Sequence, residues 1–105
     1  MVLMEFSITP LGEGESVGEY VARCVDIIDK SGLDYQLHAM GTNVEGELDQ
    51  VLDLLKRCTE EVAKMANRVS VTAKFDYREG HSGMLREKVA SVEKLLGRRL
   101  KTEPG

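Results

Sequence analysis

The sequence predicts an α+β fold in which helices cover one face of a single sheet. Three short segments alternate apolar and polar residues, three longer segments repeat apolar residues every three or four positions, and glycines lie between several of them. The predicted order is strand, helix, strand, strand, helix, strand and a final helix. This order is the split βαβ, or ferredoxin-like, plan: an antiparallel sheet with two helices on one face, followed here by a C-terminal helix.

The first strand is expected over residues 2–9, where alternate side chains belong to a buried and an open face. Pro10 and the glycines after it are expected to stop the strand. Ser16 and Glu19 have the spacing of a capping box, in which each side chain bonds a free amide at the start of a helix. We expect this helix to end near residues 31–32, at a serine and a glycine.

A hairpin is expected next, because residues 35–40 alternate, Gly41 interrupts them, and residues 42–47 can return as a third strand. The longest amphipathic helix should then cover residues 47 to about 67, and residues 69–77 alternate again as the fourth strand. The expected apolar face of the longest helix is Leu48, Val51, Leu52, Leu55, Cys58, Val62, Met65 and Ala66. The last helix repeats apolar residues at Leu85, Val89, Val92 and Leu96.

Length and composition indicate one globular domain. A chain of 105 residues is long enough for one core and too short for two. We expect residues 1–100 to form this domain and residues 101–105 to be a flexible tail. No apolar run approaches the roughly 20 residues that span a bilayer, and the first residues lack the basic start of a signal peptide. A cytoplasmic location is therefore expected.

Charge and motif content argue against several classes of function. The formal net charge of −4 disfavours nucleic acid as a partner, and an RNA-recognition sheet would need aromatic residues in its central strands. Cys24 and Cys58 form no C-x-x-C motif, so we expect two buried thiols rather than a metal or redox site. His38 and His81 are isolated, with no nucleophile beside them. We therefore expect a protein that is not an enzyme and carries no metal or cofactor.

Several stretches together resemble the small thiamine-binding protein family. They are YQLHAMGTNVEGELDQV, VTAKFDYREG and LREKVASVEKLL, after the opening strand MEFSITPLG. The similarity spans nearly all of residues 2–100, and its most specific parts are M-G-T-x-x-E-G and K-x-D-x-R. It implies a stand-alone ferredoxin-like chain that binds thiamine or its hydroxymethylpyrimidine precursor without catalysis. It also implies self-association into a dimer or a tetramer of paired dimers.

Under this resemblance, the chemistry of thiamine suggests which residues contact the ligand. Thiamine carries a cationic thiazolium, an aminopyrimidine with donor and acceptor edges, and a hydroxyethyl tail. A site for it needs a carboxylate, one or two hydroxyl or amide partners, and an apolar slot. The candidates are Ser7, His38, Met40, Thr42, Glu45 and Arg78.

Each candidate has a structural alternative. Glu45 can instead accept hydrogen bonds from the amides of the next helix, and Thr42 can simply close the turn. Arg78 can form an ion pair with Asp76, or it can bind a phosphate group on the ligand. Few aromatic residues are expected near the site, so Met40 or a residue of a neighbouring subunit would have to supply part of its apolar wall.

Two other functional classes stay open from the sequence. The first is a structural or regulatory module whose open sheet face only assembles subunits and binds no small molecule. The second is an enzyme that acts on a thiamine precursor, which the lack of a nucleophile, base or metal cluster makes the weakest of the three.

Overall fold

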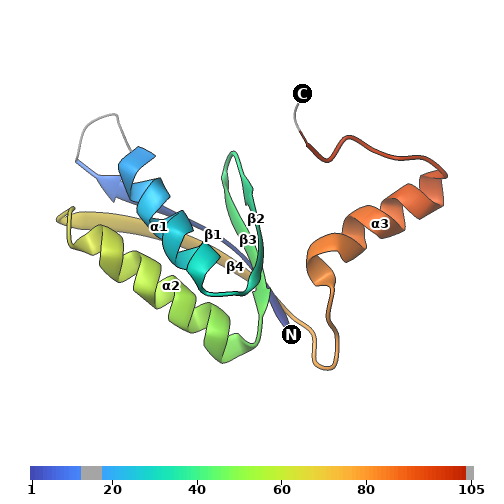
Figure 1. Cartoon of the computed structure of the whole chain (residues 1–105), viewed down its shortest axis with the longest axis horizontal. Helices are drawn as coiled ribbons and strands as arrows, with labels where there is room; N and C mark the ends of the chain where they lie inside the picture. The colour runs from blue at the N-terminus through green and yellow to red at the C-terminus, as the bar shows by residue number, and fades with distance from the viewer. Residues whose placement is uncertain (13–17, 104–105) are drawn as a thin grey trace.

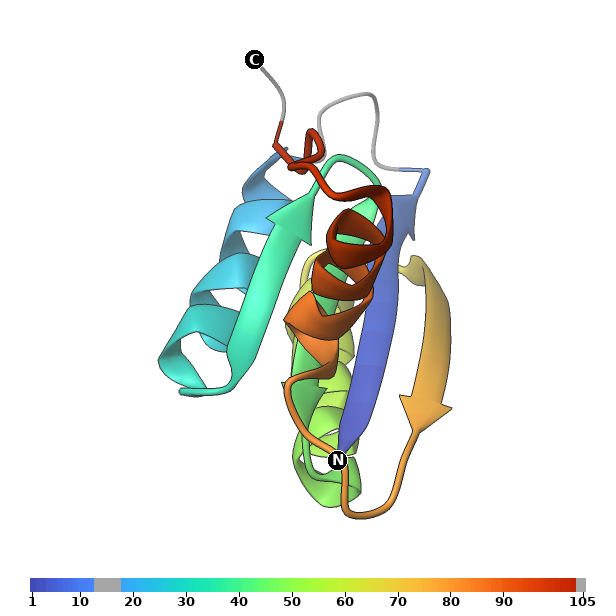
Figure 2. The same cartoon turned by 90° about the vertical axis from the view of Figure 1, so that its right-hand side faces the viewer.

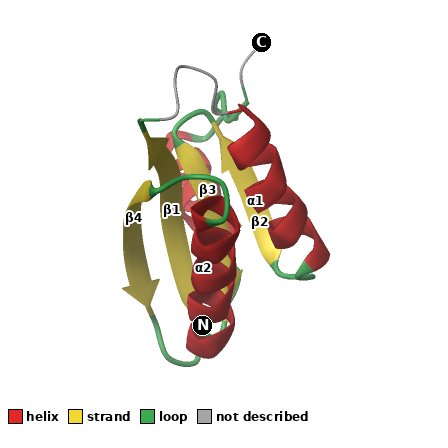
Figure 3. Ribbon diagram, turned by 90° about the vertical axis from the view of Figure 1, so that its left-hand side faces the viewer, coloured by secondary structure: helices red, strands yellow, loops and turns green. Residues whose placement is uncertain are grey.

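The computed structural model describes residues 1–12 and 18–103, and this part of the chain folds into four strands and three helices. The strands form one antiparallel sheet in the order β2-β3-β1-β4. Helices α1 and α2 cover one face of the sheet (Figure 3), and α3 lies on the other side (Figures 1 and 2). The elements are β1 (Val2–Leu11), α1 (Gly18–Lys30), β2 (Asp34–His38), β3 (Gly41–Gly46), α2 (Leu48–Ala63), β4 (Arg68–Tyr77) and α3 (Met84–Leu96). The predicted ferredoxin-like α+β class is confirmed.

The core lies between the sheet and the two helices α1 and α2. Met4 of β1 stands between Val44 and Phe75, and Phe6 stands between Thr42 and Ala73, so the rows of side chains on this face are continuous across the strands. Each fully buried large apolar side chain stabilises the fold by roughly 1.5–3 kcal/mol. The buried cluster consists of Val2, Met4, Phe6, Cys24, Ile28, Val44, Val51, Leu54, Cys58 and Val62.

The first strand is longer than predicted, because β1 continues through Pro10 to Leu11. Beyond Phe6, β1 has no partner on the β3 side and pairs with β4 alone. A proline fits such a one-sided position, since its missing N–H need not remove a hydrogen bond from the sheet. The predicted capping box at Ser16 lies outside the described residues.

The long helix α2 differs from its prediction in length and in its buried face. It ends at Ala63 rather than near residue 67. Leu54, which the predicted face omitted, is 1% exposed, whereas Leu48 and Leu52 are 42% and 43% exposed. The residues that are buried on α2 follow the spacing three, four and four: Val51, Leu54, Cys58 and Val62. The apolar residues of this helix form a stripe too wide for the sheet to cover completely.

Helix α3 is attached to the open face of the sheet by its first turn. Met84 is buried, the amide of Leu85 donates to Glu45 Oε1 at 3.0 Å, and the guanidinium of Arg86 donates to both carboxylate oxygens of Asp34 at 2.5 and 3.1 Å. Further along, Leu95 is 86% exposed, and the helix points away from the rest of the domain (Figure 1). None of the helices in the described ranges is long and apolar enough to cross a membrane.

Candidate functional site

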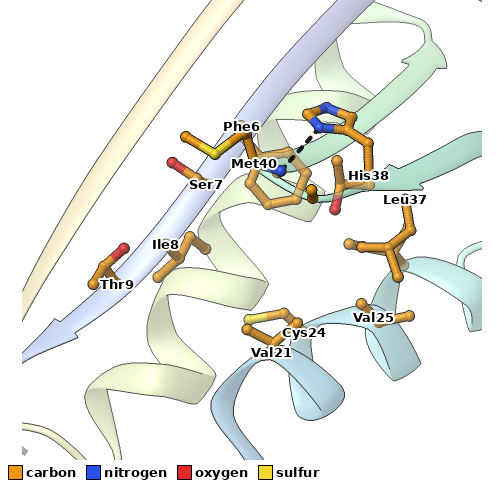
Figure 4. A pocket seen from close by; sticks show the side chains of 14 residues that line it. Phe6, Ser7, Ile8, Thr9, Val21, Cys24, Val25, Leu37, His38 and Met40 are labelled. Carbon is orange, nitrogen blue, oxygen red and sulfur yellow. Dashed lines mark hydrogen bonds between the residues drawn. The ribbon is translucent and has the colours of Figure 1, made fainter. Parts of the chain in front are cut away.

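A difference in strand length opens a cavity beside the tip of the β2–β3 hairpin. The last β1–β3 pair is Phe6 with Thr42, so the remainder of β1, from residue 7 to residue 11, has no neighbour on that side. Helix α1 passes over this uncovered stretch and roofs it. The result is a cavity of about 210 Å³ between β1, α1 and the hairpin tip (Figure 4).

The walls of this cavity are mainly apolar. Phe6 and Ile8 approach it from β1, while the side chains of the hairpin tip close the opposite side (Figure 4). Phe6 is only 4% exposed, so its ring has a fixed place at the boundary between core and cavity. The remaining apolar contributions come from Val21, Cys24, Val25, Ile28, Leu37, Ala39 and Met40.

Three residues with hydroxyl groups belong to the lining: Ser7 and Thr9 of β1 and Thr42, the second residue of β3. Thr42 pairs with Phe6 and shares its face of the sheet, whereas Ser7 and Thr9 lie on the opposite face, so Thr42 is the one of the three whose side chain is on the cavity face. None of these three hydroxyls forms a hydrogen bond with another residue in the described ranges. Thr42 is only 6% exposed, so its hydroxyl is largely shielded from solvent and available to a molecule in the cavity. Polar groups that are shielded without a partner gain the most from binding a complementary ligand.

His38 is held in one orientation by its neighbours. Its Nδ1 accepts a hydrogen bond from the backbone amide of Met40 at 3.2 Å, which assigns the proton of the neutral ring to Nε2 (Figure 4). Nε2 lies 3.3 Å from Asn43 Oδ1 and 3.5 Å from Glu5 Oε2. Because both ring nitrogens have protein partners, we expect His38 to fix the shape of the hairpin tip rather than to bind a ligand through its nitrogens.

The lining carries little charge. Among the described residues that line the cavity there is no Asp, Glu, Lys or Arg. Glu5 lies behind His38 on the open face of the sheet, with 57% of its side chain exposed. No cluster of three or more potential metal ligands occurs in residues 1–12 and 18–103. The cavity therefore suits a small, flat and neutral group with hydrogen-bonding edges.

Four of the six predicted ligand residues line this one cavity: Ser7, His38, Met40 and Thr42. Glu45 does not. Thr42 and Glu45 are three residues apart on one strand, so their side chains lie on opposite faces of the sheet. Glu45 is 5% exposed under α3, where its Oε1 accepts the Leu85 amide and its Oε2 has no hydrogen-bond partner among the described residues.

Arg78 also lies away from the cavity, at the loop between β4 and α3. Its backbone amide donates to the carbonyl of Met1, and its guanidinium is 3.7 Å from Glu87 rather than paired with Asp76. His81 bonds the same Glu87 carboxylate. This hydrogen bond, with a smaller contribution from Arg78, lowers the pKa of Glu87 below its usual value. The arrangement fixes the loop that leads into α3.

Several cavity residues were not predicted from the sequence. Phe6 was expected only as part of the alternating first strand, and the contribution of α1, through Val21 and Cys24, was not foreseen. Tyr35 of β2 is not part of the lining, and its hydroxyl donates to Asp29 at 2.8 Å. The sequence could have indicated the cavity, because the first strand is longer than the strands of the hairpin. This difference was missed because Pro10 was expected to end the first strand.

The chain matches a family described as thiamine-binding protein over residues 4–93. A UPF0045 protein of Mycobacterium bovis is 44% identical over 96 residues, which cover 90% of this chain and 94% of that protein. A UPF0045 protein of Synechocystis is 40% identical over 96 residues, which cover 90% and 79% of the two chains.

Two solved structures extend the similarity to three dimensions. A hypothetical protein of Methanocaldococcus jannaschii has a TM-score of 0.81 at 33% identity, covering 89% of this chain and 96% of that one. A protein of Thermotoga maritima, named as a candidate thiamine biosynthesis/salvage protein, has a TM-score of 0.76 at 25% identity. In that case the alignment covers 87% of this chain and 97% of the other.

Proposed function

The chain belongs to the thiamine-binding protein family, and from this premise we propose that it binds thiamine or hydroxymethylpyrimidine and catalyses no reaction. The observation that supports this most is the cavity at the hairpin tip, with its apolar walls and the shielded Thr42 hydroxyl, which has no hydrogen-bond partner among the described residues. An aminopyrimidine is flat, and its edge carries an amino donor and ring-nitrogen acceptors. A hydroxyl can form a hydrogen bond with either kind of group, because it can both donate and accept.

The size and charge of the cavity favour the pyrimidine half of thiamine. Its volume of about 210 Å³ is below the roughly 300–1,000 Å³ usual for drug-sized ligands. A thiazolium cation would gain nothing from walls without a carboxylate. We therefore propose that the pyrimidine enters between Phe6 and Met40, with a hydrogen bond to Thr42, while the thiazolium stays at the mouth, where Ser7 lies at the edge of the lining. His38 keeps the mouth in shape, and Glu45 and Arg78 of the same chain make no contact with the ligand.

Titration calorimetry with fragments tests this assignment. Thiamine and hydroxymethylpyrimidine should bind with affinities within about tenfold of each other, since the pyrimidine carries the shared contacts. The thiazole half alone should give no measurable heat. Tight binding of the thiazole half, or binding of thiamine with none of the pyrimidine, would contradict the proposed orientation.

A matched pair of variants tests the location. Thr42→Val keeps the shape of the side chain and removes one hydrogen bond, which is typically worth about 0.5–1.5 kcal/mol, or about two- to tenfold in affinity. Glu45→Gln changes the other end of the same strand and should leave the affinity unchanged. Circular dichroism of both variants is the control for folding. A loss of affinity in Glu45→Gln with none in Thr42→Val would instead place the site on the sheet face under α3.

The absence of catalysis is part of the proposal and has its own test. Incubated with thiamine, its phosphates or simple acyl phosphates, the protein should convert none of them. A rate that increases with protein concentration and persists after repurification would contradict it.

We also propose that the protein is a cytoplasmic homo-oligomer, either a dimer or a tetramer. Large apolar side chains are exposed on β4 and α3, including Phe75 at 40%, Tyr77 at 60% and Leu96 at 52%, and exposed apolar surface of this kind is typical of interfaces. Closed symmetry is the usual outcome for a single type of chain. Light scattering at micromolar concentration should give two or four times the chain mass, and a monomer would exclude this assembly.

The alternative is an oligomerisation module without a small-molecule ligand. The exposed apolar residues of α3 and β4 favour it, since they are explained by assembly alone. The two proposals differ in the calorimetry described above. A chain that assembles normally and binds neither thiamine nor hydroxymethylpyrimidine would be such a module.

A further inference from the structure

The two cysteines face each other across the helices α1 and α2. Cys24 Sγ is 3.8 Å from the carbonyl oxygen of Cys58, and Cys58 Sγ is 3.7 Å from the carbonyl oxygen of Cys24. Each thiol thus donates to the backbone of the other residue. Such reciprocal contacts require the two helices to be close at this point. Both thiols are free in the structure.

Only one of these thiols meets the cavity. Cys24 is 8% exposed and belongs to the cavity lining, where Figure 4 draws it between Val21 and Val25 of α1. Cys58 is completely buried behind it. A small molecule in the cavity can therefore reach Cys24, whereas Cys58 is reached only through Cys24. The pair is ordered as an outer and an inner thiol.

The electrostatics favour the same order. The neighbouring Cys58 thiol lowers the pKa of Cys24, in spite of the burial of Cys24. The same interaction, together with burial, raises the pKa of Cys58. Since the thiolate is the reactive form of cysteine, the outer residue is the better nucleophile.

We propose that Cys24 and Cys58 are an oxidation site for a small hydroperoxide, which enters the cavity, reacts with Cys24 and leads to a disulfide between α1 and α2. This proposal rests on the cavity and the thiol pair, and it holds whether or not thiamine is the ligand. It differs from the expectation of two inert core thiols, since a structural role requires neither their mutual contact nor access from the cavity.

The reaction balances in two steps. The Cys24 thiolate attacks the hydroperoxide, the O–O bond breaks, one oxygen remains on sulfur as a sulfenic acid, and the other leaves and takes up a proton. Cys58 then attacks the Cys24 sulfur, so that an S–S bond forms and the S–O bond breaks. The leaving hydroxide combines with the proton of Cys58 as water. Overall, the two thiols lose two electrons and the hydroperoxide gains them.

Peptide mapping of the full-length protein tests the proposal. The protein is treated with hydrogen peroxide, unfolded, alkylated and cleaved with trypsin, which releases the two cysteines in separate peptides, residues 24–30 and 58–64. We expect these two peptides to be joined, and the joined species to disappear on reduction. Two alkylated peptides after a treatment that oxidises the unfolded chain would overturn the proposal.

Single variants test the order of the two thiols. In Cys58→Ser, peroxide should convert Cys24 to a sulfenic acid that a 1,3-dione reagent traps. In Cys24→Ser, Cys58 should react at least tenfold more slowly. Equal rates, or faster reaction of Cys58, would contradict entry through the cavity. If a serine variant fails to fold, the alanine variant replaces it. Peptide mapping of the wild-type protein still decides whether the disulfide forms.

Discussion

The two ends of the β2–β3 hairpin have opposite surroundings. At the tip, around Gly41, the neighbouring strand β1 continues without a partner on the β3 side and leaves a cavity. At the base, Asp34 and Glu45 hold the first turn of α3 against the sheet. The tip thus has a shielded hydroxyl, that of Thr42, without a partner among the described residues, whereas the base uses its carboxylates within the protein. One short hairpin separates the proposed place of binding from the place where α3 is attached.

This contrast shows that two residues close together on one strand need not belong to the same site. Thr42 and Glu45 belong to one motif, and both are buried, at 6% and 5% exposure. They nevertheless serve opposite faces of the sheet, because side chains alternate along a strand. The motif M-G-T-x-x-E-G therefore contains one residue beside the cavity, Thr42, and one that holds α3, Glu45.

The largest effect is expected from closing the tip. A Cβ atom added at Gly41 would lie 2.6 Å from the backbone oxygen of Phe6, which cannot move without shifting β1. Gly41→Ala should therefore lower the free energy of unfolding by about 2–3 kcal/mol, the upper part of the range for overpacked sites. Urea unfolding measures this loss.

Gly46 at the base is the matched control. An added Cβ there meets the side-chain ends of Gln50 and Leu33 at 3.2 Å rather than backbone, and a shift of a few tenths of an ångström relieves both contacts while Gln50 keeps its bond to the Glu47 amide. Gly46→Ala should therefore cost less than about 1 kcal/mol. Equal losses in the two variants would remove the distinction between a rigid tip and an adaptable base.

A smaller effect is expected at Glu45. Glu45→Ala removes the acceptor for the Leu85 amide, and should lower the free energy of unfolding by about 1–2 kcal/mol. Glu45→Gln keeps an oxygen acceptor, so its cost should be lower. Hydrogen exchange of the Leu85 amide should become faster in the alanine variant only. Unchanged exchange there would mean that α3 is attached by its other contacts.

The smallest effect is expected from the exposed pair Asp34–Arg86. The hydrogen bond from Arg86 lowers the pKa of Asp34 below 3.8. The pair therefore stabilises the fold above that value, and the contribution is lost as the pH falls from 3.8 through the lower folded-state pKa. Asp34→Asn should cost about 0.5 kcal/mol near neutral pH, because exposed pairs contribute little. The difference from the unmodified chain should vanish in acid, and a constant difference would assign it to something other than charge.

The sequence predicts most of the fold because the periodicities of its elements are clear. The errors have local causes: Pro10 was taken to end a strand that pairs on one side only, and Leu54 was passed over because the neighbouring Leu52 and Leu55 complete an equally regular apolar face. Tertiary contacts decide which edge of such a wide stripe is buried.

The site is predictable only where its residues are neighbours on the hairpin or on β1. His38, Met40 and Thr42 are close in the chain, so any hairpin brings them together. The roof of the cavity depends on where α1 crosses the sheet, which no local pattern specifies, and so Val21 and Cys24 were not foreseen. By contrast, the placement of Thr42 and Glu45 on opposite faces of the sheet follows from the alternation of side chains along a strand and could have been predicted from the sequence.

The one-sided pairing of β1 beyond Phe6 also has a spectroscopic consequence. In residues 7–11, the N–H groups of Ser7, Thr9 and Leu11 point toward β4, whereas that of Ile8 points toward the side that β3 leaves empty, where Pro10 has no N–H to present. The Ile8 amide should therefore exchange with solvent deuterium much faster than its neighbours. A molecule that fills the cavity should slow the exchange of Ile8 alone, so this one amide reports occupancy even when the ligand is unknown.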